Sequence, residues 1–155
     1  MNQDYLDRKH PVHLPPVERH NTPVILFVTL GLQPRSPSLA DERFRDAFTF
    51  ACQCANAWSV GRYMIMPDHV HFFCCPAHEP RIGIKTWSSF LKRQITARYG
   101  PHDWDWQSDV WDTQIRSGEH YRERWDYIRQ NPVRKGWVRL VDEWPWQGEL
   151  NVLQW

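Results

Sequence analysis

A pair of histidines, His69 and His71, is the first grouping in this sequence that could do chemistry. One residue, Val70, separates them, and the apolar run 72–75 follows. Successive side chains of a β-strand point to opposite faces, so a strand would place both imidazoles side by side. Neutral imidazole is the commonest metal ligand among side chains. The pair could therefore hold one metal ion, although two histidines on a strand can also be structural residues with hydrogen-bond partners.

The segments around this pair predict two antiparallel strands joined by a tight turn. Residues 60–66 and 69–75 are rich in β-forming side chains, and Pro67 and Asp68 between them are typical turn residues. The histidines would then begin the second strand of this hairpin, immediately after the turn.

Apolar patterning predicts the remaining elements. Residues 24–30 form a continuous β-rich apolar run, typical of a central strand buried on both faces. Residues 39–57 repeat apolar side chains every three or four positions, which indicates a helix capped by Ser38. Three later elements are expected: a helix from 84 to just before Gly100, a strand over 110–115 and a helix capped by Ser117 that runs to about 130.

The element order is strand, helix, strand, strand, helix, strand, followed by an added helix. This βαββαβ order is typical of the ferredoxin-like α+β sandwich, a four-stranded antiparallel sheet with helices on one face and the other face open. Val70, Phe72 and Cys74 would meet the helices. The two histidines would lie on the open face, where a site can be built.

Length and composition limit the domain count, the partners and the compartment. The 155 residues fit one domain, expected over residues 22–155, after a poorly ordered arm over residues 1–21. The net charge is only +1, so any nucleic-acid surface must be local. The ten tryptophans could stack on unpaired bases, but most are expected in the core. We find no zinc-type cysteine spacing, signal peptide or membrane span, and we expect a cytoplasmic protein with reduced thiols.

Four short motifs taken together resemble one family. They are residues 66–71 (Met-Pro-Asp-His-Val-His), 106–107 (Trp-Gln), 115–119 (Ile-Arg-Ser-Gly-Glu) and 127–136 (Tyr-Ile-Arg-Gln-Asn-Pro-Val-Arg-Lys-Gly). They are similar to the REP-associated tyrosine transposases, which belong to the HUH single-strand endonuclease superfamily. In that superfamily a His-hydrophobic-His strand holds a divalent ion and a helix presents a nucleophilic tyrosine. The resemblance extends over roughly residues 24–146, and the combination is far more specific than an H-x-H motif alone.

The resemblance implies roles for four residues. His69 and His71 match the metal-binding histidines, Tyr127 matches the nucleophile, and Asn131 matches an amide-type third ligand. Positions i and i+4 lie on one helix face, so the last two could approach the same ion. Asn131 could equally be a plain helix N-cap. Tyr121 is a rival nucleophile, but the Asn-Pro-Val sequence that follows favours Tyr127.

The sequence departs from the family pattern at two positions. Asp68 stands where many relatives carry Asn, and Thr113 stands where many carry His. A carboxylate at position 68 could support the histidines as a hydrogen-bond partner, or it could simply shape the turn, which is the interpretation we favour.

The resemblance also implies an activity. It is that of a metal-dependent endonuclease and strand transferase, a transposase, which cleaves single-stranded DNA at hairpin-forming repeats through a covalent 5′-phosphotyrosine. Mg²⁺ or Mn²⁺ is the expected cofactor, because an open site completed by water and phosphate oxygens suits these ions. We expect a monomer rather than a dimer. The alternative is a catalytically inactive ferredoxin-like module that binds structured single-stranded nucleic acid and does not need Tyr127.

A local basic patch would hold the phosphates of the DNA. The candidates are Lys85, Lys92, Arg93, Arg98, Arg116, Arg129, Arg134 and Lys135.

Overall fold

The computed structural model describes residues 16–17, 23–33, 38–79 and 81–155 of the chain. Most of the expected arm over residues 1–21 therefore lies outside the described residues. Within its described part, the backbone N–H of Val17 donates to Oε1 of Gln114 over 2.7 Å. The division into an arm and one domain over residues 22–155 stays a prediction.

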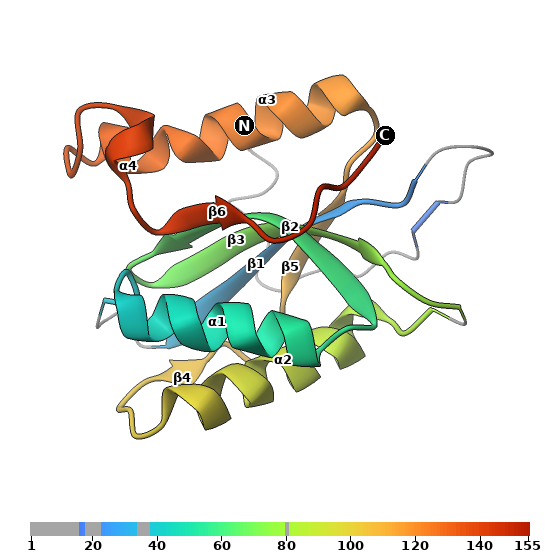
Figure 1. Cartoon of the computed structure of the whole chain (residues 1–155), viewed down its shortest axis with the longest axis horizontal. Helices are drawn as coiled ribbons and strands as arrows, with labels where there is room; N and C mark the ends of the chain where they lie inside the picture. The colour runs from blue at the N-terminus through green and yellow to red at the C-terminus, as the bar shows by residue number, and fades with distance from the viewer. Residues whose placement is uncertain (1–15, 18–22, 34–37, 80) are drawn as a thin grey trace.

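An antiparallel sheet forms the centre of the domain (Figure 1). Its long strands are β1 (Leu26–Gln33), β2 (Trp58–Met66) and β3 (His69–Pro76). Its short strands are β4 (Asp105–Trp106), β5 (Trp111–Gln114) and β6 (Gln147–Glu149). The order across the sheet is β4-β1-β3-β2-β6, and β5 pairs with β1.

The sheet edge next to β1 is formed by two short strands. β4 pairs with Leu32 and Gln33, whereas β5 pairs with residues 26–29 of the same strand. When β4 and β5 are counted as one interrupted strand, the chain follows the expected ferredoxin-like order. Sequence analysis predicted only the β5 segment, and β6 adds a further strand beside β2. The predicted α+β class is confirmed.

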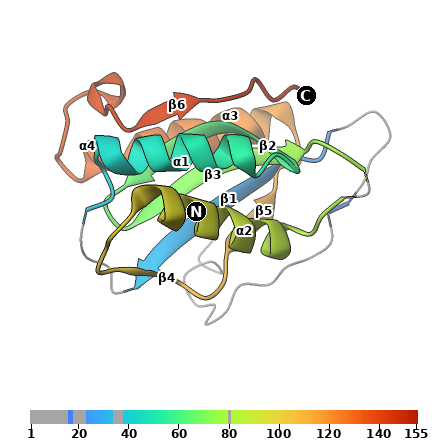
Figure 2. The ribbon, with the colours of Figure 1, turned by 60° about the horizontal axis from the view of Figure 1, so that its bottom comes forward.

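Two helices, α1 (Glu42–Cys54) and α2 (Ile84–Tyr99), cover one face of this sheet (Figure 2). Their apolar sides join the strands in one hydrophobic cluster, which includes Val70, Phe72 and Cys74 of β3 as predicted. The rings of Phe48 and Phe72, for example, lie 5.8 Å apart. Every second side chain of β3 therefore points into this core.

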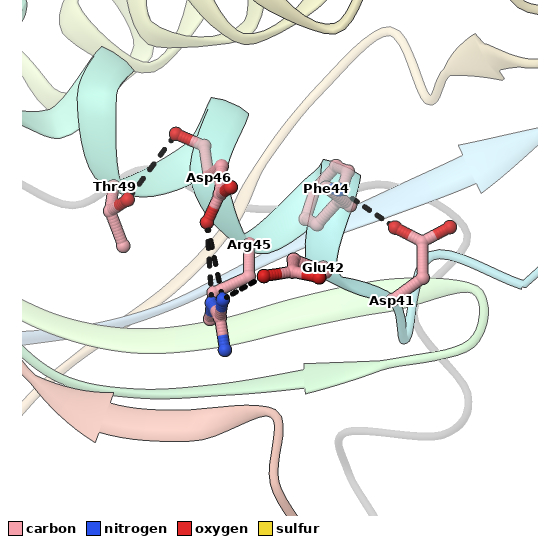
Figure 3. Close-up of polar contacts among 6 residues, drawn as sticks. All are labelled: Asp41, Glu42, Phe44, Arg45, Asp46 and Thr49. Carbon is pink, nitrogen blue, oxygen red and sulfur yellow. Dashed lines mark hydrogen bonds and ion pairs between the residues drawn. The ribbon is translucent and has the colours of Figure 1, made fainter.

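Helix α1 starts later than the predicted position, Leu39. Asp41 caps it in place of Ser38, because Oδ1 of Asp41 accepts a hydrogen bond from the backbone N–H of Phe44 over 2.7 Å (Figure 3). Leu39 is fully buried, and its N–H donates to the carbonyl of Pro67 over 2.7 Å. This stretch fastens the start of α1 to the β2–β3 turn, so it is not available for a further helical turn.

Helices α3 (Gly118–Arg129) and α4 (Asn131–Arg134) lie over the opposite face of the sheet (Figure 1). Ser117 caps α3 as predicted, since its Oγ accepts from the N–H of His120 over 3.0 Å. The side chains of Tyr121, Trp125 and Ile128 form a buried stripe at helical spacing. They pack against the sheet, so the prediction that this face is open was wrong for the part that α3 covers.

The C-terminal segment folds back over the domain, as expected for residues 137–155. Its strand β6 pairs with β2, and the indole N–H of Trp144 donates to the carbonyl of Ile65 over 3.0 Å. The guanidinium of Arg129 binds the carboxylate of Asp142 and lies 3.3 Å from Oε1 of Gln147. These contacts connect the end of α3 to the segment. In the described part of the chain, no helix has the length and apolar character that crossing a membrane requires.

Candidate functional site

The two histidines of β3 point to the face of the sheet that α3 covers. Nε2 of His69 lies 3.0 Å from Nε2 of His71, and the ring centroids are 4.5 Å apart. Phe73, two residues further along the strand, is on the same face and packs against Tyr121 of α3 at 4.4 Å between centroids. The predicted alternation along β3 therefore does bring the two imidazoles together.

Each histidine has an oxygen partner at its other ring nitrogen. Nδ1 of His69 lies 2.6 Å from Oδ1 of Asp68, and Nδ1 of His71 lies 2.7 Å from the hydroxyl oxygen of Thr29. Partners of this kind fix the orientation of metal-binding imidazoles. Asp68 therefore contacts its neighbouring histidine in addition to forming the turn. The sequence interpretation had favoured the turn as its single role.

His71 is held in its neutral form. Burial lowers its pKa well below the usual value for histidine, and electrostatic interactions with His69 and Arg124 lower that pKa further. Because a metal ion binds the neutral imidazole, this electrostatic environment suits a ligand.

The spacing of the two Nε2 atoms can be tested against a metal ion. Adjacent ligands of an octahedral ion with bonds of about 2.1 Å lie about 3.0 Å apart, because the separation is √2 times the bond length. The observed separation is 3.0 Å, and at this distance the two rings form a hydrogen bond with each other. Within the described residues, no group of three or more His, Cys, Asp or Glu side chains is placed to hold a metal. The pair thus fits an ion whose other ligands come from amides, water or substrate.

The side chain of Gln107 lies on this face beside the histidines. A Cβ atom built on Gly31 would be only 2.8 Å from Oε1 and 2.9 Å from Cδ of Gln107. Gly31 pairs with His69 across β1 and β3, and cross-strand partners point to the same face. The amide of Gln107 therefore takes the place of a side chain next to His69. Sequence analysis quoted this glutamine in a motif but gave it no role.

Tyr127 is near the C-terminal end of α3, and 42% of its surface is exposed. The guanidinium of Arg134 lies 4.4 Å from the centre of its ring and donates to the carbonyl of Tyr127 over 2.9 Å. Figure 1 shows α4 and the β2–β3 turn at the same end of the molecule. The tyrosine is thus carried at the end of the sheet where β3 begins.

Asn131 is the first residue of α4, and Gln130 occupies the cap position without a side-chain hydrogen bond. The interpretation of Asn131 as a plain N-cap was therefore wrong. Its side-chain oxygen instead accepts a hydrogen bond from Arg134. A role as metal ligand would require that contact to be exchanged.

Arg124 connects the flank of α3 to the histidine pair. Its guanidinium lies 5.2 Å from the centre of the Phe27 ring, which stacks on His71 at 5.2 Å. On a helix with 3.6 residues per turn, positions 120, 124 and 127 share one flank. Tyr127 thus lies on the flank of α3 that Arg124 turns toward His71. Sequence analysis missed Arg124, although its spacing from Tyr127 was a usable signal.

Tyr121 has a very different environment from Tyr127. Only 6% of its surface is exposed, and burial raises the pKa of its hydroxyl above the usual value. Among the described residues, that hydroxyl has no hydrogen-bond partner. Tyr121 is a core residue, which removes the main reason for treating it as a rival to Tyr127.

The eight basic candidates do not form one patch. Lys85, Arg93 and Arg98 lie on α2, which packs on the opposite face of the sheet from α3. Lys92 is buried, and its ammonium donates to the carbonyls of Gln107 over 2.8 Å and Asp109 over 3.1 Å. Its prediction as a phosphate contact conflicts with this placement, because its charge is used inside the domain.

The other four candidates lie on the α3 side of the domain. Arg129 is occupied by its contacts with the C-terminal segment. Arg134 and Lys135 are exposed, and Arg134 contacts the tyrosine. Arg116 lines an open hollow together with Thr113, Ser117, His120 and Arg124.

No family model matches the chain. The REP-associated tyrosine transposase of Escherichia coli (strain K12) is 34% identical over 91 residues, which cover 58% of this chain and 50% of that protein. A putative REP-associated tyrosine transposase of Haemophilus influenzae (strain ATCC 51907 / DSM 11121 / KW20 / Rd) is 29% identical over 140 residues, covering 79% of this chain and 77% of its own. The match thus spans half the length of the Escherichia coli relative.

A solved structure of a REP-associated tyrosine transposase bound to a REP hairpin superposes with a TM-score of 0.67 and 25% sequence identity. It covers 86% of this chain and 82% of the other. Fold and site define an α+β domain in which a histidine pair on the sheet shares one face with a tyrosine-bearing helix. In sequence and in fold the chain is similar to the REP-associated tyrosine transposases.

Proposed function

We propose that the chain is a metal-dependent endonuclease and strand transferase that acts on single-stranded DNA with hairpin-forming repeats. The observation that carries this proposal is the pair of Nε2 atoms, 3.0 Å apart, on the same side of the sheet as the exposed Tyr127. The bound REP hairpin of the solved relative supports the substrate class.

His69 and His71 would hold the ion, Mg²⁺ or Mn²⁺, with Asn131 as the proposed third protein ligand. The ion would supply Lewis-acid stabilisation of charge on the nonbridging phosphate oxygens. Asp68 and Thr29 keep the imidazoles oriented through their Nδ1 atoms. These partners favour a geometry that exists before substrate arrives.

In the proposed reaction, the hydroxyl oxygen of Tyr127 attacks the phosphorus atom of the scissile phosphodiester. A tyrosine–phosphate bond forms to the 5′ side, the bond from phosphorus to the 3′ oxygen breaks, and that oxygen leaves as a 3′-hydroxyl. The phenol loses its proton to water as it attacks, and the departing 3′ oxygen takes up one proton from water, so the step balances. The covalent bond preserves the energy of the phosphodiester for a later transfer to another 3′-hydroxyl.

The test is to incubate a labelled hairpin oligonucleotide with a single-stranded extension, the protein and Mn²⁺. A protein–DNA adduct that survives denaturation is expected, and chelation with EDTA should abolish it. Tyr127→Phe should reduce the adduct to background, whereas Tyr121→Phe should retain it. His69→Ala should abolish cleavage and leave hairpin binding largely intact.

Two outcomes would contradict the proposal. Loss of the adduct in Tyr121→Phe but not in Tyr127→Phe would show that Tyr121, and not Tyr127, is the nucleophile. Hairpin binding with no adduct under any metal condition would instead favour the catalytically inactive binding module.

A further inference from the structure

An open hollow lies beside the start of α3 and is lined by Thr113, Arg116, Ser117, His120 and Arg124. Two guanidinium groups, an imidazole and two hydroxyls thus converge on one surface. None of these residues is a proposed metal ligand or nucleophile. The exposed Glu123 raises the pKa of the imidazole, whereas both arginines lower it.

The imidazole of His120 is arranged as a hydrogen-bond donor. Its Nδ1 accepts from the backbone N–H of Arg116 over 3.1 Å, so in the neutral ring the proton is on Nε2. Burial, together with the charges of Arg124 and Arg116, lowers the pKa of His120, in agreement with a neutral ring among cations. Nε2 of His120 and the guanidinium nitrogens of Arg116 and Arg124 are therefore donors, as an anion requires.

Two residues of the hollow, His120 and Arg124, lie on the flank of α3 that carries the tyrosine. Positions 120, 124 and 127 share that flank, and the rise from 120 to 127 is about 10 Å at 1.5 Å per residue. Arg124 links the two regions, since it lies over Phe27 next to His71. A DNA strand whose scissile phosphate lies at Tyr127 could thus continue along this flank.

We propose that this basic hollow binds a backbone phosphate of the DNA strand whose scissile phosphate lies at Tyr127. The inference rests on the proposed function for the path of the strand. Guanidinium groups match phosphate oxygens in a fork geometry and read no sequence. A local pair of arginines also explains how a chain with a net charge of +1 can bind a polyanion.

The test uses Tyr127→Phe protein, in which no covalent step interferes, and a hairpin oligonucleotide with a single-stranded extension. Its affinity is measured over a series of salt concentrations without added metal. Loss of one phosphate contact on a single strand makes the negative slope of log K against log salt shallower by about 0.7. Arg116→Gln should show this loss, and Arg116→Lys should restore most of it because the charge is kept.

Arg122→Gln is the matched control. Arg122 is exposed on α3, but its guanidinium lies near Gly118, outside the hollow. Arg122→Gln removes the same charge as Arg116→Gln and should leave the slope unchanged. A scan of single methylphosphonates along the extension should identify one position that weakens binding to the parent protein but not to Arg116→Gln.

Equal slopes for Arg116→Gln and Arg122→Gln, whether both reduced or both unchanged, would overturn the assignment of the hollow. The outcome is separable from that of the proposed function. If the protein with Tyr127 intact forms the adduct and Arg116→Gln binds normally, the hollow alone is excluded. If the adduct never forms and Arg116→Gln still loses slope, the hollow stands and the catalytic proposal falls.

Discussion

The substitution Tyr121→Phe should stabilise the protein. The residue is 6% exposed, its ring packs 4.4 Å from that of Phe73, and its hydroxyl has no hydrogen-bond partner among the described residues. A buried hydroxyl left without a partner costs about 1–3 kcal/mol. Taking the lower end, we expect the free energy of unfolding to rise by about 1 kcal/mol. For a domain of this size the Tm should rise by about 2–4 °C.

The same substitution should change the response to alkaline pH. Burial raises the pKa of Tyr121 above the value of about 10 that it has in the unfolded chain. The unfolded state therefore releases this proton first, and the stabilising contribution is lost as the pH rises through the folded-state pKa. Tyr121→Phe removes that contribution. The variant should lose less stability above about pH 10 than the parent, while Tyr63, whose pKa burial also raises, keeps part of the dependence.

Urea denaturation at neutral pH and above pH 10 would measure both effects. Tyr127→Phe is the matched control, because its ring is 42% exposed and its substitution should change the free energy of unfolding by less than about 0.5 kcal/mol. A loss of 1 kcal/mol or more in Tyr121→Phe at neutral pH would refute the reasoning, since the hydroxyl would then have an essential partner.

Two further predictions concern the region around β4. Gly31→Ala places a methyl group 2.8 Å from Oε1 of Gln107, so the Gln107 side chain must move away. The free energy of unfolding should change by less than about 1 kcal/mol in thermal melts, but the adduct yield should fall several-fold. An unchanged yield would show that Gln107 has no role in the reaction. Lys92→Met removes two hydrogen bonds from a buried ammonium to backbone carbonyls. It should cost about 1.5–3 kcal/mol in urea denaturation, and an unchanged midpoint would contradict the structural role of the lysine.

The β2–β3 hairpin and the helices were predictable from the sequence because each has a clear apolar period. The β4 and β6 strands were not, since two and three residues carry no period. The alternation of β2 is also interrupted. Val60 and Tyr63 both face the α1–α2 layer although they are three residues apart, because the pairing register with β3 shifts between them. Such a bulge is set by packing against neighbours and leaves no mark in local composition.

The site was predictable to different degrees. The shared face of His69 and His71 follows from strand alternation alone, whereas Tyr127 was identified only through the family motif. The position of Gln107 depends on pairing between β1 and β4, which are distant in the sequence. Helical spacing relates Arg124 to Tyr127, but it cannot say which part of the sheet that flank faces. Tertiary contacts decide those points.

The two edges of the sheet bear on how copies of this chain would meet. An unpaired strand at an edge is a template for strand addition from another molecule. Here the three long strands lie inside the sheet, and the edges consist of strands of two, four and three residues. The described part of the chain therefore offers only short, interrupted edges to a second copy. An architecture of this kind disfavours assembly by joining sheets.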